Sequence, residues 1–375
     1  MNSDQESRPA TLPLSPRSVA AFFAPPGDII SITPHGRGLI NDSYLVRRRR
    51  GEDFLLQRLN PAIFPQPEML LGNLRLVSQH LGGKIAGAGA GKRHQAVRLL
   101  PARQGRDFHY DQEGNCWRAL NFIGPSRVLS RIATEEQAGA AGSALGLFHA
   151  WLADLPVNRL ADPLPAFHVT PWVLATYEQI AAARPEPAGA AGDQRFCRDF
   201  ISRRRSSVAG LEQARARGIL REQVIHGDPK LTNILFDRTE DRALALIDLD
   251  TIKPGLLQYD IGDCLRSCCN RAGEDPGDPA AVEFDLDLAR ALLAGYCQPM
   301  RPLLTRGDLA CFYDAARLIT FELGLRFFSD YLAGNCYFKA DDPEHNLRRA
   351  LTQFRLTASI ESRERPFRLL MAELT

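Results

Sequence analysis

The 375-residue chain lacks an uninterrupted run of about 20 apolar residues, so the sequence offers no transmembrane helix. Its eight cysteines are too few for a disulfide-stabilised scaffold, and we expect reduced thiols in a cytoplasmic protein. The 46 lysines and arginines nearly balance the 44 aspartates and glutamates, and a net charge of +2 provides no broad basic surface for nucleic acid. We therefore expect neither a membrane nor a nucleic-acid partner.

Lysine is the scarcest of the charged residues, because only five of the 46 basic side chains are lysines. A lysine at a motif position is therefore more informative than any one arginine. Apolar residues make up 45% of the chain and charged residues 24%, which is typical of a globular protein. The length suggests two domains. We expect a disordered tail over residues 1–18, an N-terminal lobe over 19–125 and a C-terminal lobe over 126–375.

Short, alternating segments separated by glycine and proline predict a small antiparallel sheet in the first lobe. Residues 28–59 indicate three strands, 94–102 and 116–124 indicate two more, and the 3.6-residue apolar period of 67–81 indicates a helix. The pattern after residue 125 is mostly helical, with short strand-like runs around 224–250. The sequence therefore predicts an α+β, bilobal fold, with a five-stranded antiparallel N-lobe and a mostly helical C-lobe.

The most informative stretch begins at His226, reads HGDPKLTN, and is followed by the strand-like run ALALIDLD. Phosphoryl transfer needs a carboxylate to deprotonate the attacking hydroxyl, and oxygen ligands for the Mg2+ that bridges the phosphates of ATP. Asp228 and Asn233 have the spacing of the catalytic loop of kinases, and Lys230 brings a cation near the transferred group. Asp248 lies where kinases carry a second magnesium ligand. This order and spacing predict an ATP-dependent phosphotransferase that uses Mg2+.

A glycine-rich turn between the first two expected strands is a candidate phosphate-binding loop. It contains Gly36 and Gly38, followed by Asn41 and Ser43, and its backbone amides could cover the phosphates of ATP. An ordinary hairpin would have the same sequence pattern.

Kinases also carry a cation on the third strand of this lobe, paired with a carboxylate on the next helix. Arg58 ends the third expected strand, and Glu68 is the only acid between Asp53 and Asp107. We therefore assign Arg58 to the phosphates of ATP and Glu68 as its partner. A surface ion pair is the alternative for both residues.

The run VIHGDPKLTNILFD, continued by IDLDTIKPGLLQYDIGD, resembles the aminoglycoside phosphotransferase and choline kinase superfamily, which has a protein-kinase-like fold. Further blocks are similar to the N-acetylhexosamine 1-kinase group, namely GRGLINDSYLV, FLLQRLNPAIFPQPEMLLGNL, CWRALNFI, LRFFSDYLAGNCYFK and EHNLRRALTQFRL. The resemblance spans about residues 30 to 360. It implies ATP-dependent phosphorylation of a free sugar at its anomeric hydroxyl.

The resemblance also implies roles for individual residues. Asp228 would be the catalytic base, with Asn233 and Asp248 as magnesium ligands, and Arg326 and Tyr337 would lie near the sugar. From the residues alone, Arg326 could instead form an ion pair with a neighbouring acid on its helix, Glu322 or Asp330. Asp250 is a further candidate, which we place at the substrate.

Three positions depart from the pattern of the N-acetylhexosamine 1-kinases. That group commonly has histidine where this chain has Leu39, an aromatic residue where it has Ser267, and asparagine where it has Gly227. The residues that handle phosphate are complete, while those expected around the sugar differ.

Two rival functions remain open from the sequence. A kinase of an aminoglycoside or an amino alcohol would share the phosphate machinery, but its cationic acceptor calls for a pocket lined by carboxylates. A nucleotide-binding pseudokinase that serves as an interaction module would bind ATP without turnover, and the presence of Asp228, Asn233 and Asp248 argues against it.

Overall fold

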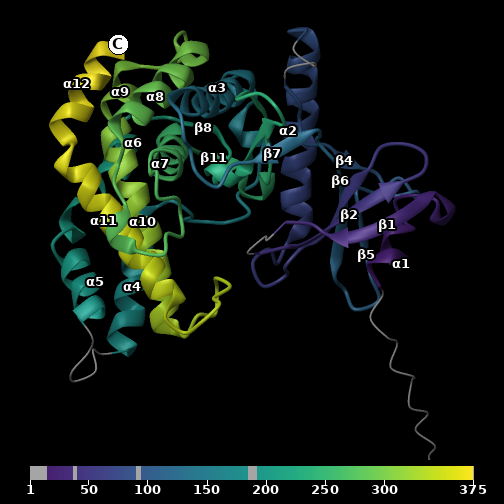
Figure 1. Ribbon diagram of the computed structural model, residues 1–375, viewed down its shortest axis with the longest axis horizontal. Coiled ribbons are helices and arrows are strands. Elements are labelled where there is room, and N and C mark those ends of the chain that lie inside the picture. The colour runs from purple at the N-terminus through teal and green to yellow at the C-terminus, as the bar shows by residue number, and fades with distance from the viewer. Residues whose placement is uncertain (1–14, 37–39, 90–93, 185–191, 375) are drawn as a thin grey trace, which may run out of the picture. The chain divides into compact units, whose positions relative to one another are not determined.

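The computed structural model describes residues 15–36, 40–89, 94–184 and 192–374. The chain forms two compact units (Figure 1). The first comprises the residues up to Pro67 together with Leu99–Phe122, and the second comprises Glu68–Arg98 and Ile123–Thr375. The expected tail extends to residue 18, but the first helix, α1, already begins at Pro16, and residues 1–14 lie outside the described part.

The first unit is built on an antiparallel sheet whose strands follow the order β1-β2-β3-β6-β4. The strands are β1 (Ile29–Pro34), β2 (Asp42–Arg48), β3 (Phe54–Arg58), β4 (Leu99–Leu100), β5 (Phe108–Tyr110) and β6 (Cys116–Asn121). Phe54 and Leu56, alternate residues of β3, are buried in one cluster with Val19 and Ala20 of α1 (Pro16–Ala20). This period of two residues is what a sheet with one covered face requires.

The fifth position of this sheet is shared by two short strands. β4 pairs with Ala119 and Leu120 of β6, and β5 pairs with Cys116–Arg118 on the same edge. The strand expected over 94–102 is therefore limited to Leu99–Leu100, because the preceding backbone bonds elsewhere: the amide of Gln95 donates to the carbonyl of Leu244 at 2.8 Å. β5 was not expected. The prediction of an antiparallel sheet with five positions is confirmed.

The second unit is mostly helical, as expected. Its longer helices are α2 (Pro67–Gly87), α3 (Glu135–Leu152), α4 (Thr170–Ala183), α5 (Gly192–Ser202), α7 (Leu257–Cys268), α8 (Leu286–Met300), α10 (Phe312–Ala333), α11 (His345–Ser362) and α12 (Glu364–Leu374). The short helices α6 (Gly210–Ala216) and α9 (Arg306–Ala310) complete the set in the described residues. Helix α10 is buried along most of its length and packs against α4, α7 and α11 (Figure 1).

Two small sheets frame the loops of the second unit. β8 (Glu222–Ile225) pairs with β11 (Lys253–Leu256). β9 (Ile234–Asp237) lies between β7 (Ser126–Val128) and β10 (Ala243–Leu246). The HGDPKLTN segment connects β8 to β9, and the turn that contains Asp248 connects β10 to β11. Each of these two connections is therefore fixed at both ends by paired strands.

Helices α3 and α8 approach each other unusually closely. A side chain at Gly142 would meet the backbone oxygen of Leu292 at 1.9 Å, which leaves room for glycine alone. The close packing brings His149 of α3 to the hydroxyl of Tyr296 on α8, at 3.0 Å.

Within the described ranges, no helix combines the length and apolarity needed to cross a membrane.

Candidate active site

The loop between β8 and β9 is held by hydrogen bonds to a buried carboxylate on α7. Both oxygens of Asp260 accept from loop amides, that of His226 at 2.7 Å and that of Gly227 at 2.8 Å. Oδ2 also faces the Nε2 atom of His149 at 2.8 Å. Burial alone would raise the pKa of the Asp260 carboxyl, but its hydrogen bond with His149 and the nearby imidazoles lower it. Asp260 is therefore an ionised anchor for the loop.

Gly227 has a left-handed backbone, with φ of 85°. A Cβ atom there would lie 2.6 Å from the carbonyl oxygen of Thr251. Asparagine tolerates the left-handed region but has a Cβ atom, so it would collide with Thr251 in this chain. The departure at Gly227 thus has a local steric reason.

The next residues bring a carboxylate, an ammonium and an amide together. Lys230 Nζ lies 2.5 Å from Asp228 Oδ2, and Asn233 Nδ2 donates to the same oxygen at 3.0 Å and to the Asp228 carbonyl at 2.8 Å. Burial would raise the pKa of the Asp228 carboxyl, but the Lys230 ammonium outweighs it and the pKa is lowered. Asp228 is therefore ionised, and no residue of the described chain donates to its second oxygen, Oδ1.

Asp248 begins the turn after β10 and has a left-handed backbone, with φ of 64°. The preceding residue, Ile247, ties this turn to the loop: its amide donates to the Asn233 carbonyl at 2.9 Å, and its carbonyl faces the His226 ring at 3.0 Å. The Asp248 carboxylate is exposed and contributes to raising the pKa of Lys230, so the two charges are neighbours. Asp250 lies in the same turn and is buried.

Ser267 also holds the loop. Its hydroxyl on α7 accepts the amide of Leu231 at 2.8 Å, and both residues are buried. The serine that departs from the N-acetylhexosamine 1-kinase pattern thus completes the backbone hydrogen bonding of the loop.

Removal of the Ser267 hydroxyl is expected to destabilise this chain. Ser267→Ala leaves the buried Leu231 amide without its acceptor, which costs roughly 1–3 kcal/mol of the free energy of unfolding. Urea denaturation of the variant and the parent measures the loss. The exposed Ser207→Ala serves as the control and should change stability by about 0.5 kcal/mol or less. Equal effects of the two substitutions would contradict this role of Ser267.

Arg326 and Tyr337 come together in an aromatic cluster. The guanidinium carbon of Arg326 lies 4.8 Å from the ring centre of Phe167, 5.8 Å from that of Tyr337 and 5.4 Å from that of Phe338. The ion pair considered for Arg326 is wrong for both candidate partners, because each carboxylate is used elsewhere. Glu322 bonds to His168 and Thr170, while Asp330 accepts backbone amides. Within the described ranges, the contacts of the Arg326 guanidinium are with these aromatic rings and not with a carboxylate.

Asp330 organises the segment that carries Tyr337. One oxygen accepts the amides of Cys336 at 2.9 Å and Tyr337 at 2.8 Å, and the other accepts the amide of Phe338 at 2.9 Å. Asn346 of α11 donates to the same carboxylate at 2.9 Å. The sequence pattern did not reveal this role, because the amides that Asp330 accepts are six to eight residues further along the chain.

The structure also reveals a charge cluster, buried at Arg266 and Asp263, that the sequence analysis missed. Arg266 of α7 donates to Asp263 at 2.8 Å and to Glu274 at 2.7 Å. Burial raises the pKa of Asp263, and Asp228 adds to this effect, so the cluster is electrostatically connected to the loop. Such groups are found only once the fold places them together.

The residues expected to contact the nucleotide belong mainly to the first unit. Gly36 has φ of 76°, whereas Gly38 and Leu39 lie outside the described residues. The side chain of Asn41 accepts the amide of Asn60 at 3.0 Å, and that of Ser43 accepts from Gln57 at 2.9 Å.

The expected cation and its carboxylate fall in different units. Arg58 forms an ion pair with Asp42 at 2.5 Å and lies over the ring of Trp117. Glu68 lies in the first turn of α2, which belongs to the second unit.

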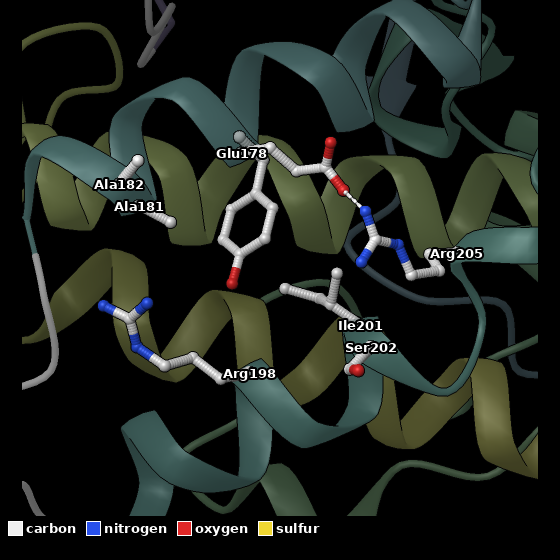
Figure 2. A pocket seen from close by; sticks show the side chains of 8 residues that line it. Glu178, Ala181, Ala182, Arg198, Ile201, Ser202 and Arg205 are labelled. Atoms are coloured by element: carbon white, nitrogen blue, oxygen red, sulfur yellow. Dashed lines mark hydrogen bonds and ion pairs between the residues drawn. The ribbon is translucent and has the colours of Figure 1, made fainter.

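A hollow of about 520 Å³ opens between α4 and α5. Figure 2 shows Arg198 and the ion pair of Glu178 with Arg205 at opposite sides of it. None of its lining residues is a predicted site residue, and the loop of Asp228 does not contribute to it. The hollow is therefore separate from the residues that the sequence predicts at the site.

The antiparallel sheet, the helical second unit and the loop of Asp228, Lys230 and Asn233 together define an α+β protein of kinase-like architecture. Residues 31–303, more than half of the chain, match the family described as Phosphotransferase enzyme family, and the chain belongs to this family. It is an ATP-dependent kinase of small molecules. The expected relationship to the aminoglycoside phosphotransferase and choline kinase superfamily is confirmed.

Solved structures share the fold at low sequence identity. An aminoglycoside phosphotransferase from Alicyclobacillus acidocaldarius is 16% identical, with a TM-score of 0.63 over 97% of this chain and 98% of that one. The amicoumacin kinase hAmiN, in complex with AMP-PNP, Ca2+ and Ami, is 17% identical, with a TM-score of 0.58 over 89% and 90%. A choline kinase from Cryptosporidium parvum is 13% identical, with a TM-score of 0.54 over 92% and 93%.

Proposed function

We propose that this kinase transfers the γ-phosphoryl group of ATP to a hydroxyl of a free sugar, with Asp228 as the catalytic base. The observation that carries the proposal is the asymmetry of the Asp228 carboxylate. Oδ2 is bonded to Lys230 and Asn233, while Oδ1 is left to accept a proton. As the acceptor oxygen forms its bond to the γ-phosphorus, the bond from that phosphorus to the β-phosphate oxygen breaks and Oδ1 takes the hydroxyl proton.

Asn233 and Asp248 fit a magnesium site. The Asn233 amide uses its nitrogen toward Asp228, so its carbonyl oxygen is directed elsewhere, and Asp248 presents an exposed carboxylate. Amide and carboxylate oxygens are suitable ligands for Mg2+. When bound, Mg2+ would neutralise charge on the phosphates. Lys230 would add a cation, positioned by its ion pair with Asp228.

Loss of either proposed ligand should raise the magnesium requirement. Asn233→Ala and Asp248→Ala each remove one oxygen ligand, so the Mg2+ concentration for half-maximal turnover should rise at least tenfold and kcat should fall. Titration of Mg2+ at saturating ATP measures both effects. Asp250→Ala should show a milder loss, since we place Asp250 at the substrate. A normal magnesium dependence in both ligand variants would contradict the alignment of this segment with kinase loops.

For the nucleotide, we propose the residues named from the sequence. The turn containing Gly36 and Gly38 would cover the phosphates with backbone amides. Arg58, whose guanidinium is paired with Asp42, would contact the α- and β-phosphates, and Glu68 is a further candidate for the nucleotide site.

Asn41 and Ser43 would support that turn. Their side chains already bond within the sheet, as the contacts of Asn41 with Asn60 and of Ser43 with Gln57 show. They would therefore act by shaping the nucleotide-binding turn.

For the acceptor, we propose a polyhydroxylated ring held by Arg326 and Tyr337. The guanidinium offers several fixed donors, and the tyrosine offers a flat ring and a hydroxyl. Its cluster contains Phe167 and Phe338 but no carboxylate of the described chain, and this uncompensated positive charge disfavours cationic amino alcohols and aminoglycosides. The sequence blocks that resemble the N-acetylhexosamine 1-kinases favour an N-acetylhexosamine as the acceptor, phosphorylated at its anomeric hydroxyl.

A panel of acceptors tests this function. ADP release should be measured with ATP and Mg2+ across free hexoses, N-acetylhexosamines, sugar acids, amino alcohols and aminoglycosides. The expected result is highest turnover with a neutral free sugar, and a product that loses the reducing end. Preference for choline-like or aminoglycoside acceptors would overturn the sugar assignment. Binding of ATP without turnover of any acceptor would favour an interaction module.

A further inference from the structure

His168 bridges two elements of the second unit that contribute to the proposed site. Its Nε2 atom lies 2.7 Å from the carbonyl oxygen of Gly227, and its Nδ1 atom lies 3.1 Å from Oε1 of Glu322 on α10. The residue is 5% exposed and has a left-handed backbone, with φ of 68°. A histidine in this conformation is strained unless its surroundings hold it, and such positions concentrate at functional sites.

The partners determine how many protons the ring carries. A carbonyl oxygen accepts only, so Nε2 must be the donor toward Gly227. Oε1 belongs to a carboxylate that is 1% exposed and whose other oxygen accepts the Thr170 hydroxyl at 2.8 Å. A carboxylate oxygen accepts, so Nδ1 is a donor toward Oε1 as well, and a ring that donates from both nitrogens is an imidazolium.

The electrostatic surroundings agree with a charged ring. Burial would lower the pKa of His168, but the hydrogen bond and the charge of Glu322, together with the charge of Asp263, raise it. Among the described groups, Asp263 and Tyr259 face the ring from α7, Glu322 faces it from α10, and Asp228 is next to its carbonyl partner.

Both contacts lead to residues of the proposed mechanism. Gly227 directly precedes Asp228, and Glu322 lies one helical turn before Arg326. A second path runs through Phe167, whose ring lies 4.0 Å from that of His168 and 4.8 Å from the Arg326 guanidinium. His168 therefore connects the loop of the base with the helix of the acceptor residue.

We propose that His168, as an imidazolium paired with Glu322, is a positioning residue that holds Asp228 in register with the acceptor at Arg326. It touches neither the phosphates nor the acceptor and acts through the Gly227 carbonyl. This inference depends on the roles proposed above for Asp228 and Arg326. Because small displacements of reacting groups reduce rates steeply, loss of the bridge should lower kcat about 10–100-fold.

The protonation state is tested without any acceptor. Long-range 1H–15N spectra of the full-length protein labelled at histidine should show both nitrogens of His168 protonated at neutral pH, with the signal assigned by its loss in His168→Asn. Glu322→Gln keeps hydrogen-bonding groups toward His168 and Thr170 but removes the charge, so the ring should become neutral. A neutral His168 in the parent protein would overturn the imidazolium.

The positioning role is tested by kinetic coupling to the base. His168→Asn suits the left-handed backbone and keeps a donor near Glu322 but loses the bond to Gly227. With N-acetylglucosamine, or the sugar of the panel that is turned over fastest, kcat should fall while KM for ATP stays within about twofold. In the Asp228→Asn background the same substitution should have little further effect, because both act on one step. His80→Asn on α2, which bonds to Trp151 and Asp154, is the matched control.

The outcomes separate this inference from the proposed function. If Asp228→Asn retains full turnover, the base assignment fails. The positioning role alone fails if Asp228→Asn loses turnover but His168→Asn has no effect. It also fails if the fold-losses in kcat of the two single variants multiply in the double variant. A fall in the unfolding midpoint of His168→Asn with unchanged kcat per folded molecule would return His168 to a structural role.

Discussion

Asp228→Asn is expected to lower kcat by about 10²–10⁴, because no other group of the loop can accept the hydroxyl proton at that position. Asparagine keeps the size of the side chain and can still accept from Lys230 and Asn233 at the position of Oδ2, which lies 2.5 Å and 3.0 Å from their nitrogens. Binding of ATP should therefore persist. Steady-state ADP release gives kcat, and calorimetric titration of ATP gives the affinity.

Asp241→Asn is the matched control for this experiment. Asp241 forms a 2.5 Å ion pair with Arg127, and its side chain is 25% exposed against 26% for Asp228, but it lies in the turn between β9 and β10. The control should retain turnover. Near-normal kcat in Asp228→Asn, or an equal loss in both variants, would remove Asp228 from the role of base.

The pH dependence of kcat gives a second expectation for Asp228. Lys230 lowers the pKa of this carboxyl below its ordinary value of 3.8 despite burial. The base is then ionised across the neutral range and loses activity only when it is protonated. The acidic limb that Asp228 contributes should lie below pH 3.8, so kcat should not fall between pH 8 and 5 on account of this group.

Arg326→Ala should reduce kcat/KM for the acceptor by one to three orders of magnitude, about 1.4–4 kcal/mol of transition-state stabilisation. The guanidinium is held only by aromatic faces in the described structure, so its N–H groups are available to the hydroxyls of a sugar. Arg326→Lys keeps the charge but loses the planar fork, and it should recover only part of the loss. Acceptor titrations at saturating ATP measure both variants.

Arg317→Ala provides the control for Arg326→Ala on the same helix. Arg317 lies near Asp314 and Glu361 and bonds to Ser207, so its loss removes these contacts and no proposed acceptor contact. The Arg326 variant should keep the parental KM for ATP and an unfolding midpoint close to that of the parent. An equal effect on ATP, or a matching loss of thermal stability, would make Arg326 a structural residue.

The parts of this site that sequence analysis predicted are those set by local spacing. Asp228, Lys230 and Asn233 lie within six residues of one another, and the loop brings their side chains into contact as the motif predicts. The family resemblance, and not spacing, placed Arg326 and Tyr337 together, and the guanidinium carbon lies 5.8 Å from the tyrosine ring centre.

The supporting partners could not be predicted, because they are distant in sequence and meet only through packing. Asp260 and His149 are 111 positions apart, and His168 and Glu322 are 154 apart. Each of these residue types has many ordinary uses in a chain, and nothing local marks the pairing. The short strand β5 was not predicted for a related reason, since its three residues become a strand only beside β6.

If Tyr337 contacts the acceptor as proposed, the anchoring of its segment has a consequence for how such a kinase can change its substrate. Residues Cys336–Phe338 are tied to the fold through one carboxylate, Asp330, and that carboxylate is in turn held by Asn346 of α11. The loop between β8 and β9, which carries Asp228, has separate supports, Asp260 and Ser267 on α7. The side chains of the Tyr337 segment can therefore be exchanged, in evolution or by design, while the chemistry of phosphoryl transfer stays in place.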